Sequence, residues 1–282
     1  MLMLLFSTSA FAASAIDSDG RRVTLAQPAQ RIVSLAPHVT EQLFAAGAGA
    51  KVVAASDYSD YPEEAKRLPR VASSGAVNLE MVLALKPELV VAWRLEATAD
   101  ALRRLETLGV PVFYSEPRRL AHIPDMIEAL GELAGTADVA GPLARSLRGE
   151  LSRLEKTYRA RRPVSVFYEI SDRPLMTLGG GHFVSDAIAL CGGRNVFADA
   201  ALMAPVVNVE SVLAADPEAI ITTFDPWLEH WRRFPGMRAV QAGNLFTVPV
   251  NEMHRHGPRA IAAAGLLCRH IDAARLKAAS PR

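Results

Sequence analysis

Two stretches of the chain read almost alike: Asn78-Leu-Glu-Met-Val-Leu-Ala-Leu-Lys-Pro-Glu-Leu-Val-Val91 and Asn208-Val-Glu-Ser-Val-Leu-Ala-Ala-Asp-Pro-Glu-Ala-Ile-Ile221. Seven of the fourteen positions are identical, without gaps, at an offset of 130 residues. A solenoid needs at least three adjacent repeats, so two distant copies indicate two similar lobes. The repeat therefore predicts a chain built from two related halves.

Each copy of the repeat begins with the same helix-start pattern. Asn78 and Asn208 are predicted N-caps, because an Asn side chain accepts a hydrogen bond from the first turn of a helix. Glu80 and Glu210 fall in that first turn, where the helix dipole favours a carboxylate. The pattern predicts one short helix in each half.

Each short helix leads into a buried strand. The helix must end before Pro87 or Pro217, because the residue before proline avoids the helical conformation. Apolar runs then follow at residues 89–93 and 219–223. Continuous apolar runs are typical of parallel strands that are covered on both faces.

The same alternation of strand and helix extends along the whole chain. Further strands are predicted at residues 31–35, 51–55, 110–114, 164–168 and 245–248, and helices at residues 40–46, 97–108 and 123–133. This order predicts an α/β fold with mostly parallel sheets in both lobes.

The longest helical pattern, at residues 138–161, lies between the two halves. Apolar residues recur there at steps of three or four, and we expect one buried stripe formed by Val139, Leu143, Leu147, Leu151, Leu154 and Tyr158. No Gly/Ser/Pro-rich linker separates the halves, so one long, rigid helix is predicted to join them. The expected organisation is a signal peptide at 1–12, an N-terminal α/β lobe at 13–135, the linking helix at 136–162 and a C-terminal α/β lobe at 163–282.

Composition excludes several classes of protein. The chain has 282 residues, of which 50% are hydrophobic and 22% are charged, so it is not broadly disordered. Its formal net charge of +1 gives no global field to attract nucleic acid. We expect no nucleic-acid partner.

The first residues predict export. Residues 1–11 form a short uncharged apolar stretch, and Ala10-Phe11-Ala12 provides a small-x-small cleavage pattern. The basic segment that usually precedes such a stretch is absent, which leaves open the alternative of an apolar N-terminus on a cytosolic protein. The preferred interpretation is a periplasmic protein whose mature chain begins near Ala13.

The two cysteines, Cys191 and Cys268, lie in the C-terminal half. In an oxidising compartment a lone pair is most simply a disulfide, and the alternative is two buried thiols. Because the chain has no CxxC spacing, we expect no metal site at this pair.

Candidate ligand contacts follow the predicted strands. Ligands of open parallel sheets bind beyond the carboxyl ends of the strands, and two facing lobes would place those ends around one cleft. Aromatic and hydrogen-bonding residues gather in the corresponding segments: 37–38, 57–62, 93–94, 174–183, 224–227 and 251–256. No catalytic sequence motif occurs there, which favours binding over catalysis.

The chain resembles the periplasmic substrate-binding proteins of ABC importers that have a single helical backbone, and within them the cobalamin-binding branch. The resemblance covers residues 31–272 and rests on residues 31–47, 56–62, 78–93, 191–197 and 258–259, with SDYSDYP and ALKPELVVAWR specific to that branch. It implies the fold of class III periplasmic binding proteins and a disulfide between Cys191 and Cys268. It also implies a corrinoid as the transported ligand, and no cofactor.

The resemblance also assigns ligand contacts. Tyr58 and Trp93 fall on aromatic positions of the corrin site, and Arg255 falls on a basic position that reaches the ligand. A corrin is a large apolar disc rimmed with amides, which flat aromatic rings and a few hydrogen-bonding groups suit. Tyr58 and Trp93 alternatively serve only packing, and Arg255 alternatively pairs with Glu252.

The chain departs from the family pattern at three further aromatic positions, where it has Ser74, Met176 and Ala204. Met176 remains a predicted ligand contact, and Trp227 with Phe224 is expected to compensate for the lost rings. The departure leaves open a receptor for haem or a ferric siderophore.

Four histidines, at positions 38, 182, 254 and 256, fall on segments expected to face the cleft. Each is most simply a solvated loop residue, although His254 or His256 is a candidate axial ligand of a corrinoid or haem metal. Nothing in their spacing predicts a site for a bare metal ion.

Glu80 and Glu210 have a further implied role. In the family, one glutamate on each lobe docks onto arginines of a membrane permease dimer; the alternative is a first-turn residue that only complements the helix dipole. We therefore expect a monomeric periplasmic receptor that delivers a corrinoid to an ABC permease. An exported enzyme is the less favoured alternative.

Overall fold

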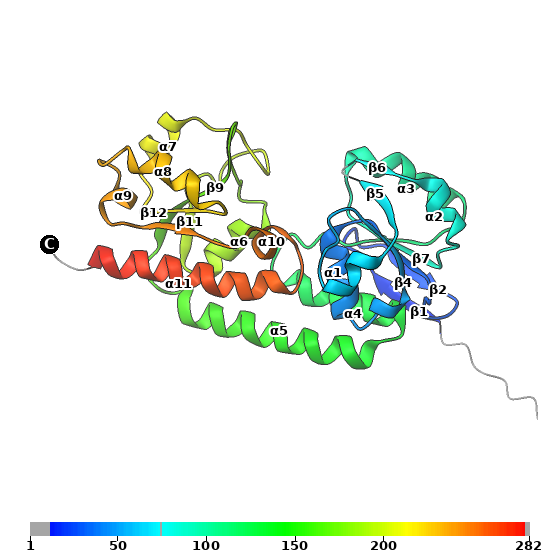
Figure 1. Ribbon diagram of the computed structural model, residues 1–282. Coiled ribbons are helices and arrows are strands. Elements are labelled where there is room, and N and C mark those ends of the chain that lie inside the picture. The colour runs from blue at the N-terminus through cyan, green and yellow to red at the C-terminus, as the bar shows by residue number, and fades with distance from the viewer. Residues whose placement is uncertain (1–11, 74, 280–282) are drawn as a thin grey trace, which may run out of the picture. The chain divides into compact units, whose positions relative to one another are not determined.

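The computed structural model describes residues 12–73 and 75–279, so residues 1–11 of the predicted signal peptide (1–12) and Ser74 lie outside the described residues (Figure 1). The described chain forms two compact units. The first unit runs to Glu116 and also includes Pro124–Arg145, and the second consists of Pro117–Ile123 and the described residues from Ser146 onward.

The first unit contains a six-stranded sheet in the order β6-β5-β4-β3-β7-β8, parallel except for the β5–β6 pair. Its strands are β3 (Ile32–Ser34), β4 (Val52–Ser56), β5 (Arg70–Ser73), β6 (Ala76–Val77), β7 (Leu89–Ala92) and β8 (Val112–Tyr114). Its helices are α1 (Pro37–Ala45), α2 (Leu79–Ala84), α3 (Ala99–Thr107) and α4 (His122–Ala134), with 3₁₀ turns η1 (Gly49–Lys51), η2 (Glu63–Arg67) and η3 (Glu96–Thr98). An antiparallel hairpin, β1 (Ala13–Ile16) and β2 (Arg22–Leu25), forms a separate two-stranded sheet.

The second unit is built around a central strand, β9 (Val164–Asp172), which pairs in parallel with β12 (Ala219–Thr222). β12 pairs in parallel with β13 (Leu245–Thr247), and β9 also pairs with β11 (Gly193–Asn195) and, antiparallel, with β10 (Leu175–Thr177). The helices are α6 (Phe183–Leu190), α7 (Val209–Ala215), α8 (Leu228–Arg232), α9 (Arg238–Gln241), α10 (Val250–His254) and α11 (Arg259–Ala279), with η4 (Asp225–Trp227) after β12.

These elements confirm the α/β class with mostly parallel sheets. All seven predicted apolar runs contain a strand, and the two strands of the repeat, β7 and β12, are buried along their whole length. Among the described helices none is both long and apolar enough to span a membrane.

The predicted long helix is α5 (Ala137–Tyr158), whose first residues belong to the first unit and whose last belong to the second. Its predicted buried stripe is wrong at Val139, which is 47% exposed. Ala140 and Ala144 are buried instead, and the buried face continues through Leu147, Leu151 and Leu154. The buried face begins with the small residues Ala140 and Ala144, and a pattern of large apolar side chains does not include them.

The two copies of the repeat have the same local structure. Oδ1 of Asn78 accepts a hydrogen bond from the backbone N–H of Met81 at 3.0 Å, and Oδ1 of Asn208 accepts one from Ser211 at 2.8 Å. Both predicted N-caps are confirmed. Each turn from helix to strand then passes through a left-handed residue at the same repeat position, Lys86 (φ 46°) or Asp216 (φ 38°).

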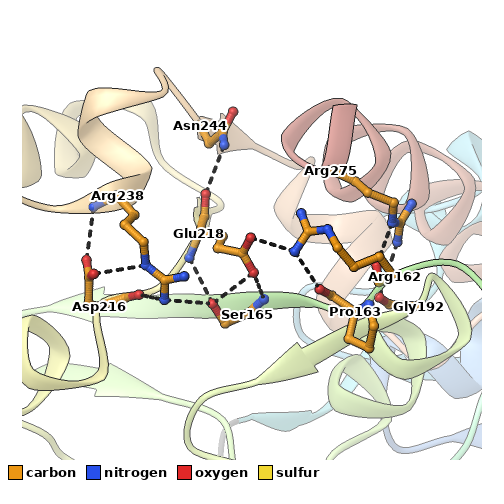
Figure 2. Close-up of polar contacts among 9 residues, drawn as sticks. All are labelled: Arg162, Pro163, Ser165, Gly192, Asp216, Glu218, Arg238, Asn244 and Arg275. Atoms are coloured by element: carbon orange, nitrogen blue, oxygen red, sulfur yellow. Dashed lines mark hydrogen bonds and ion pairs between the residues drawn. The ribbon is translucent and has the colours of Figure 1, made fainter. Parts of the chain in front are cut away.

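A second repeated contact joins each turn to the neighbouring strand. Oε2 of Glu88 accepts a hydrogen bond from the backbone N–H of Gln30 at 2.5 Å, and Oε2 of Glu218 accepts one from Ser165 at 3.0 Å. Figure 2 shows the second of these contacts, in which Arg162 also binds Glu218. The glutamate of the repeated Pro-Glu pair therefore fixes helix, turn and strand together.

Glu218 remains ionised in this position. Burial opposes ionisation, but hydrogen bonds from the Ser165 backbone and the Arg162 guanidinium outweigh it and hold the pKa of Glu218 below its ordinary value. The adjacent turn is held by Arg238, whose Nε donates to Asp216 Oδ2 at 2.9 Å (Figure 2).

Cys191 and Cys268 form the predicted disulfide within the second unit. Both cysteines are fully buried. The guanidinium of Arg275, itself 7% exposed, donates to the carbonyls of Cys191 at 3.0 Å and Gly192 at 3.2 Å. This buried arginine satisfies the backbone beside the bridge, where helix α6 ends.

Candidate binding site

Buried hydroxyl groups support the loop that carries Tyr58 in the first unit. Ser34 Oγ and Thr40 Oγ1 lie 2.7 Å apart, Thr40 donates to Ser59 Oγ at 2.9 Å, and Ser59 Oγ lies 3.2 Å from Ser56 Oγ. All four hydroxyl-bearing residues are buried. The loop after β4 is therefore held by hydrogen bonds to hydroxyl groups at the ends of the adjacent strands β3 and β4 and in α1.

Tyr58 itself points away from the core. Its backbone is left-handed, with φ of 61°, and the residue is 71% exposed. Arg70 holds the loop from the other side by donating to the carbonyls of Ser56 at 3.1 Å and Ser59 at 3.0 Å. A fixed loop that exposes an aromatic ring at the carboxyl end of a parallel strand is a suitable contact for an apolar ligand.

Trp93, directly after β7, packs edge-on against His38 with ring centroids 5.6 Å apart. His38 Nε2 lies 3.0 Å from the backbone carbonyl of Ser115, and Ser115 Oγ donates to Gln42 Oε1 at 2.6 Å. The imidazole of His38 is 3% exposed, so the expectation of a solvated His38 is wrong. His38 orients Trp93, which is half-buried, from beneath the strand end.

Two further histidines, His182 and His254 in the second unit, are half-buried. Nε2 of His254, in α10, lies 3.1 Å from the hydroxyl of Tyr168, and Nδ1 of His182 accepts the N–H of Val184 to cap α6. The pKa of both imidazoles is lowered to about 4, by burial in both cases and, for His182, also by the proximity of His254. The expectation of solvated loop histidines fails here too, because both rings serve tertiary contacts.

His256 belongs to the same ring cluster, with its centroid 4.3 Å from Phe183 and 6.0 Å from His182. In the described part of the chain, no group of three or more His, Cys, Asp or Glu residues is arranged to hold a metal ion.

A loop between β11 and α7 adds apolar contacts that the sequence analysis missed. Leu202, Met203 and Val206 are 66%, 48% and 62% exposed. Val206 forms an isolated antiparallel bridge with the predicted contact Met176, in β10. In the sequence, these exposed loop residues lie in an apolar segment, residues 201–207, that has neither strand nor helix periodicity. Ala204, an expected aromatic position in the family, is exposed on this loop.

The glycine run before α6 holds that loop in place. The N–H groups of Gly179 and Gly180 donate to the carbonyls of Met203 and Ala198 at 2.9 and 3.0 Å. A Cβ at Gly179 would come within 2.4 Å of the Leu202 carbonyl oxygen. Close packing of backbone on backbone explains these glycines.

The remaining predicted contacts follow β12 and β13. Trp227, in η4, is half-buried and packs edge-on against the exposed Phe224 at 5.6 Å. Arg255 is half-buried directly after α10, and its predicted alternative partner Glu252 receives a 2.7 Å hydrogen bond from Arg259.

One further carboxyl was missed by the sequence analysis. Glu169 is 1% exposed near the carboxyl end of β9, and its Oε2 accepts a 2.8 Å hydrogen bond from Trp231 Nε1. Burial raises the pKa of Glu169 to about 7. Its position at the end of an apolar run made it resemble an ordinary strand terminus.

Glu80 and Glu210 occupy matching places in the first turns of α2 and α7. Both are exposed, and neither makes an ion pair among the described residues. Four other positions of the repeat that are identical in both copies have clear structural roles. They are the Asn caps, the buried Val82 and Val212, the prolines that end the helices, and Glu88 and Glu218.

The chain was compared with known proteins. The periplasmic binding protein family matches residues 32–250. The vitamin B12-binding protein of Vibrio cholerae serotype O1 is 37% identical over 255 residues, covering 88% of this chain and 91% of that protein. The vitamin B12-binding protein of Vibrio parahaemolyticus is 34% identical over 257 residues, covering 89% of this chain and 92% of that protein.

Solved structures agree with this relationship. The periplasmic vitamin B12 binding protein BtuF of V. cholerae matches with a TM-score of 0.83 at 37% identity, covering 88% of this chain and 98% of that one. The periplasmic heme-binding protein RhuT from Roseiflexus sp. RS-1 matches with a TM-score of 0.74 at 26% identity, covering 87% and 99%. The relatives are named as binding proteins, and the chain belongs to the periplasmic binding protein family.

Proposed function

We propose that this protein captures cobalamin or a related corrinoid in the periplasm and delivers it to an ABC permease. The observation that carries the proposal is the exposed aromatic ring of Tyr58 on a loop fixed by buried hydroxyls. The similarity to vitamin B12-binding proteins over most of the chain supports it.

Six side chains are the proposed ligand contacts. In the first unit, Tyr58 and Trp93 would lie against the apolar disc of the corrin. In the second unit, Met176 and Trp227 would add apolar contact, while Arg255 and His254 supply polar groups. The exposed loop with Leu202, Met203 and Val206 replaces apolar area lost at the family's further aromatic positions.

Calorimetric titration with cyanocobalamin tests the proposal. The wild-type protein should bind at micromolar concentration or below, and Tyr58→Ala should weaken binding about thirtyfold. That estimate corresponds to about 2 kcal/mol for the aromatic area that the ligand would cover.

Leu108→Ala is the matched control, since Leu108 is 61% exposed after α3 and remote from the strand carboxyl ends. It should leave the affinity unchanged. Absence of heat with the wild-type protein at micromolar concentration would end the cobalamin version of the proposal.

Haem is the second candidate ligand, favoured by the ring cluster of His182, His254 and His256. Nε2 of His254 is already engaged by Tyr168, so axial ligation would have to use another imidazole nitrogen. Mixing with haem should then produce a red-shifted absorption band that His256→Ala removes; an unchanged spectrum counts against haem.

We propose a receptor without a catalytic step or resident cofactor. At the strand ends, Nε2 of His38 lies 3.0 Å from the backbone carbonyl of Ser115, and Ser115 Oγ donates to the Gln42 amide. These partners give neither group the nucleophile–base geometry that hydrolysis uses. This favours binding over an exported enzyme.

Glu80 and Glu210 are the proposed contacts with the permease, and the receptor is proposed to act as a monomer on a permease dimer. The two carboxylates are exposed, are retained in both copies and have no partner among the described residues. A carboxylate pair that meets basic pockets would orient the receptor and speed its association.

The double variant Glu80→Lys/Glu210→Lys tests docking. It should abolish cobalamin uptake by cells while the purified protein keeps wild-type affinity. Glu64→Lys, an exposed change in η2, serves as a control for added positive charge. Normal uptake by the double variant would refute the docking role.

A further inference from the structure

A cavity of about 570 Å³ lies within the second unit at the carboxyl end of β9. Glu169, Leu175, Val209, Pro226 and Trp227 form part of its wall. Trp227 is also a proposed ligand contact, so this cavity adjoins the group of residues assigned to the corrinoid. Its wall combines apolar surface with one buried carboxyl.

Six titratable or charged side chains line the cavity, and Glu169 is the most buried of them; His230 is half-buried and contacts Arg233. Asp172, Arg173, Glu229 and Arg233 are exposed at its rim, whereas Glu169 is 1% exposed. The rim charges are largely balanced, and Arg173 lies 3.6 Å from Asp172. The interior of the cavity therefore has the character of a hydrogen-bond acceptor.

The residue of the first unit that is equivalent to Glu169 shows whether the fold itself requires a carboxyl there. Ser34 of β3 pairs with Val91, and Tyr168 of β9 pairs with Ile221, which is the repeat equivalent of Val91. The next residues are therefore equivalent: Leu35 in the first unit and Glu169 in the second. Leu35 packs against the core of its unit.

The fold thus accepts an apolar residue where the second unit buries a carboxyl. Burying a carboxyl costs free energy, and Trp231 supplies one hydrogen bond to one of its two oxygens. A buried carboxyl beside a cavity with an aromatic wall is the arrangement expected of a specificity group.

We propose that this cavity receives one peripheral amide side chain of the corrinoid, with the amide N–H donating to Glu169 beside Trp227. This inference rests on the proposed function. It makes Glu169 a specificity-determining residue, because a flat ligand that carries carboxylates at its edge, as haem does, would place like charges together.

The experiment compares cyanocobalamin with its monocarboxylic derivatives, in each of which one peripheral amide has been hydrolysed to a carboxylate. Each isomer is titrated separately by calorimetry at about pH 8, where Glu169, with a pKa of about 7, is mostly ionised. Wild-type protein should bind one isomer at least about tenfold more weakly than cyanocobalamin and the others with little change.

Two variants separate recognition from packing. Glu169→Leu, which copies the first unit, should bind cyanocobalamin about ten- to a hundredfold more weakly, as expected for a lost hydrogen bond to a charged group. Glu169→Gln keeps an acceptor and gains a donor, so it should bind cyanocobalamin within about threefold of wild type and remove the penalty on the one isomer. Glu155→Gln on α5 is the control and should change neither.

The results separate the two proposals. If wild-type protein binds cyanocobalamin but Glu169→Gln shows the same isomer preferences, the amide pocket is wrong and the receptor function stands. If wild-type protein does not bind cyanocobalamin, the cobalamin assignment is wrong and the amide pocket falls with it. If Glu169→Leu fails to fold, the isomer preferences of Glu169→Gln alone decide.

Discussion

Buried titratable side chains in the second unit link its stability to pH. His182 and His254 have pKa values lowered to about 4 by burial, whereas the same imidazoles in the unfolded chain titrate near their ordinary value. Between these values only the unfolded chain binds the protons. Their stabilisation is complete above about pH 6.5 and is lost as pH falls toward 4.

Glu169 acts in the opposite direction. Its pKa is raised to about 7, so the folded state binds a proton that the unfolded state has already released, and stability falls as pH rises through this window. Each of the three groups contributes about 3 kcal/mol at most, and two histidines outweigh one glutamate.

We therefore predict a net loss of stability between about pH 7 and about pH 5, measured by urea unfolding. His182→Asn, which can still cap α6, and His254→Gln should each reduce this loss, whereas Glu169→Gln should increase it. His122→Gln, at an exposed position, is the control. An identical pH dependence in all four variants would contradict the assignment.

At the scale of elements, the repeat helices depend on their caps. We predict that Asn208→Ala lowers the free energy of unfolding by about 1 kcal/mol, because the N–H of Ser211 loses its acceptor. Asn208→Ser keeps an oxygen acceptor and should remain close to wild type in urea unfolding. Equal losses for Ala and Ser would mean that the cap contributes nothing.

Most core strands and the helices α1 to α5 and α7 were predictable because each has a local signal, whereas the long helix α11 was not predicted. Buried parallel strands are continuous apolar runs, and Asn followed by Glu and later Pro marks the two repeat helices. The hairpin β1–β2 and the strands β5, β6, β10 and β11 were not predicted, since each either mixes polar with apolar residues or has only two residues.

The candidate site was predictable only in part. Tyr58 was placed correctly on an exposed loop, because polar residues and proline follow its strand. The histidines were misjudged because their partners are distant in sequence: Tyr168 is 86 residues from His254. Glu169 was missed for the same reason, since Trp231 lies 62 residues further along the chain.

At the scale of the whole molecule, the disulfide stabilises one of the two compact units. It closes a loop with a sequence separation of 77 residues inside the second unit. Loss of this crosslink should cost about 4 kcal/mol in the chain-entropy model. The periplasmic location predicted from the N-terminus is confirmed by the family, and that compartment favours such a bond.

We predict that Cys191→Ala/Cys268→Ala unfolds at lower urea concentration, with increased hydrogen exchange confined to the second unit. The first unit provides the internal reference in the same measurement. Addition of reductant should destabilise wild-type protein and leave the variant unchanged. Equal exchange in both units would contradict a local effect.

The turns that follow α2 and α7 carry different charges on the same backbone path. Asp216 depends on Arg238, and Glu218 depends on Arg162, whereas Lys86 occupies the first of these positions in the other copy and Arg31 binds the Leu85 carbonyl nearby. Each duplicate has thus become specialised to its own surroundings. A chimera in which the second copy replaced the first would keep the shape of the turn but would bring Asp216 and Glu218 without the arginines that neutralise them.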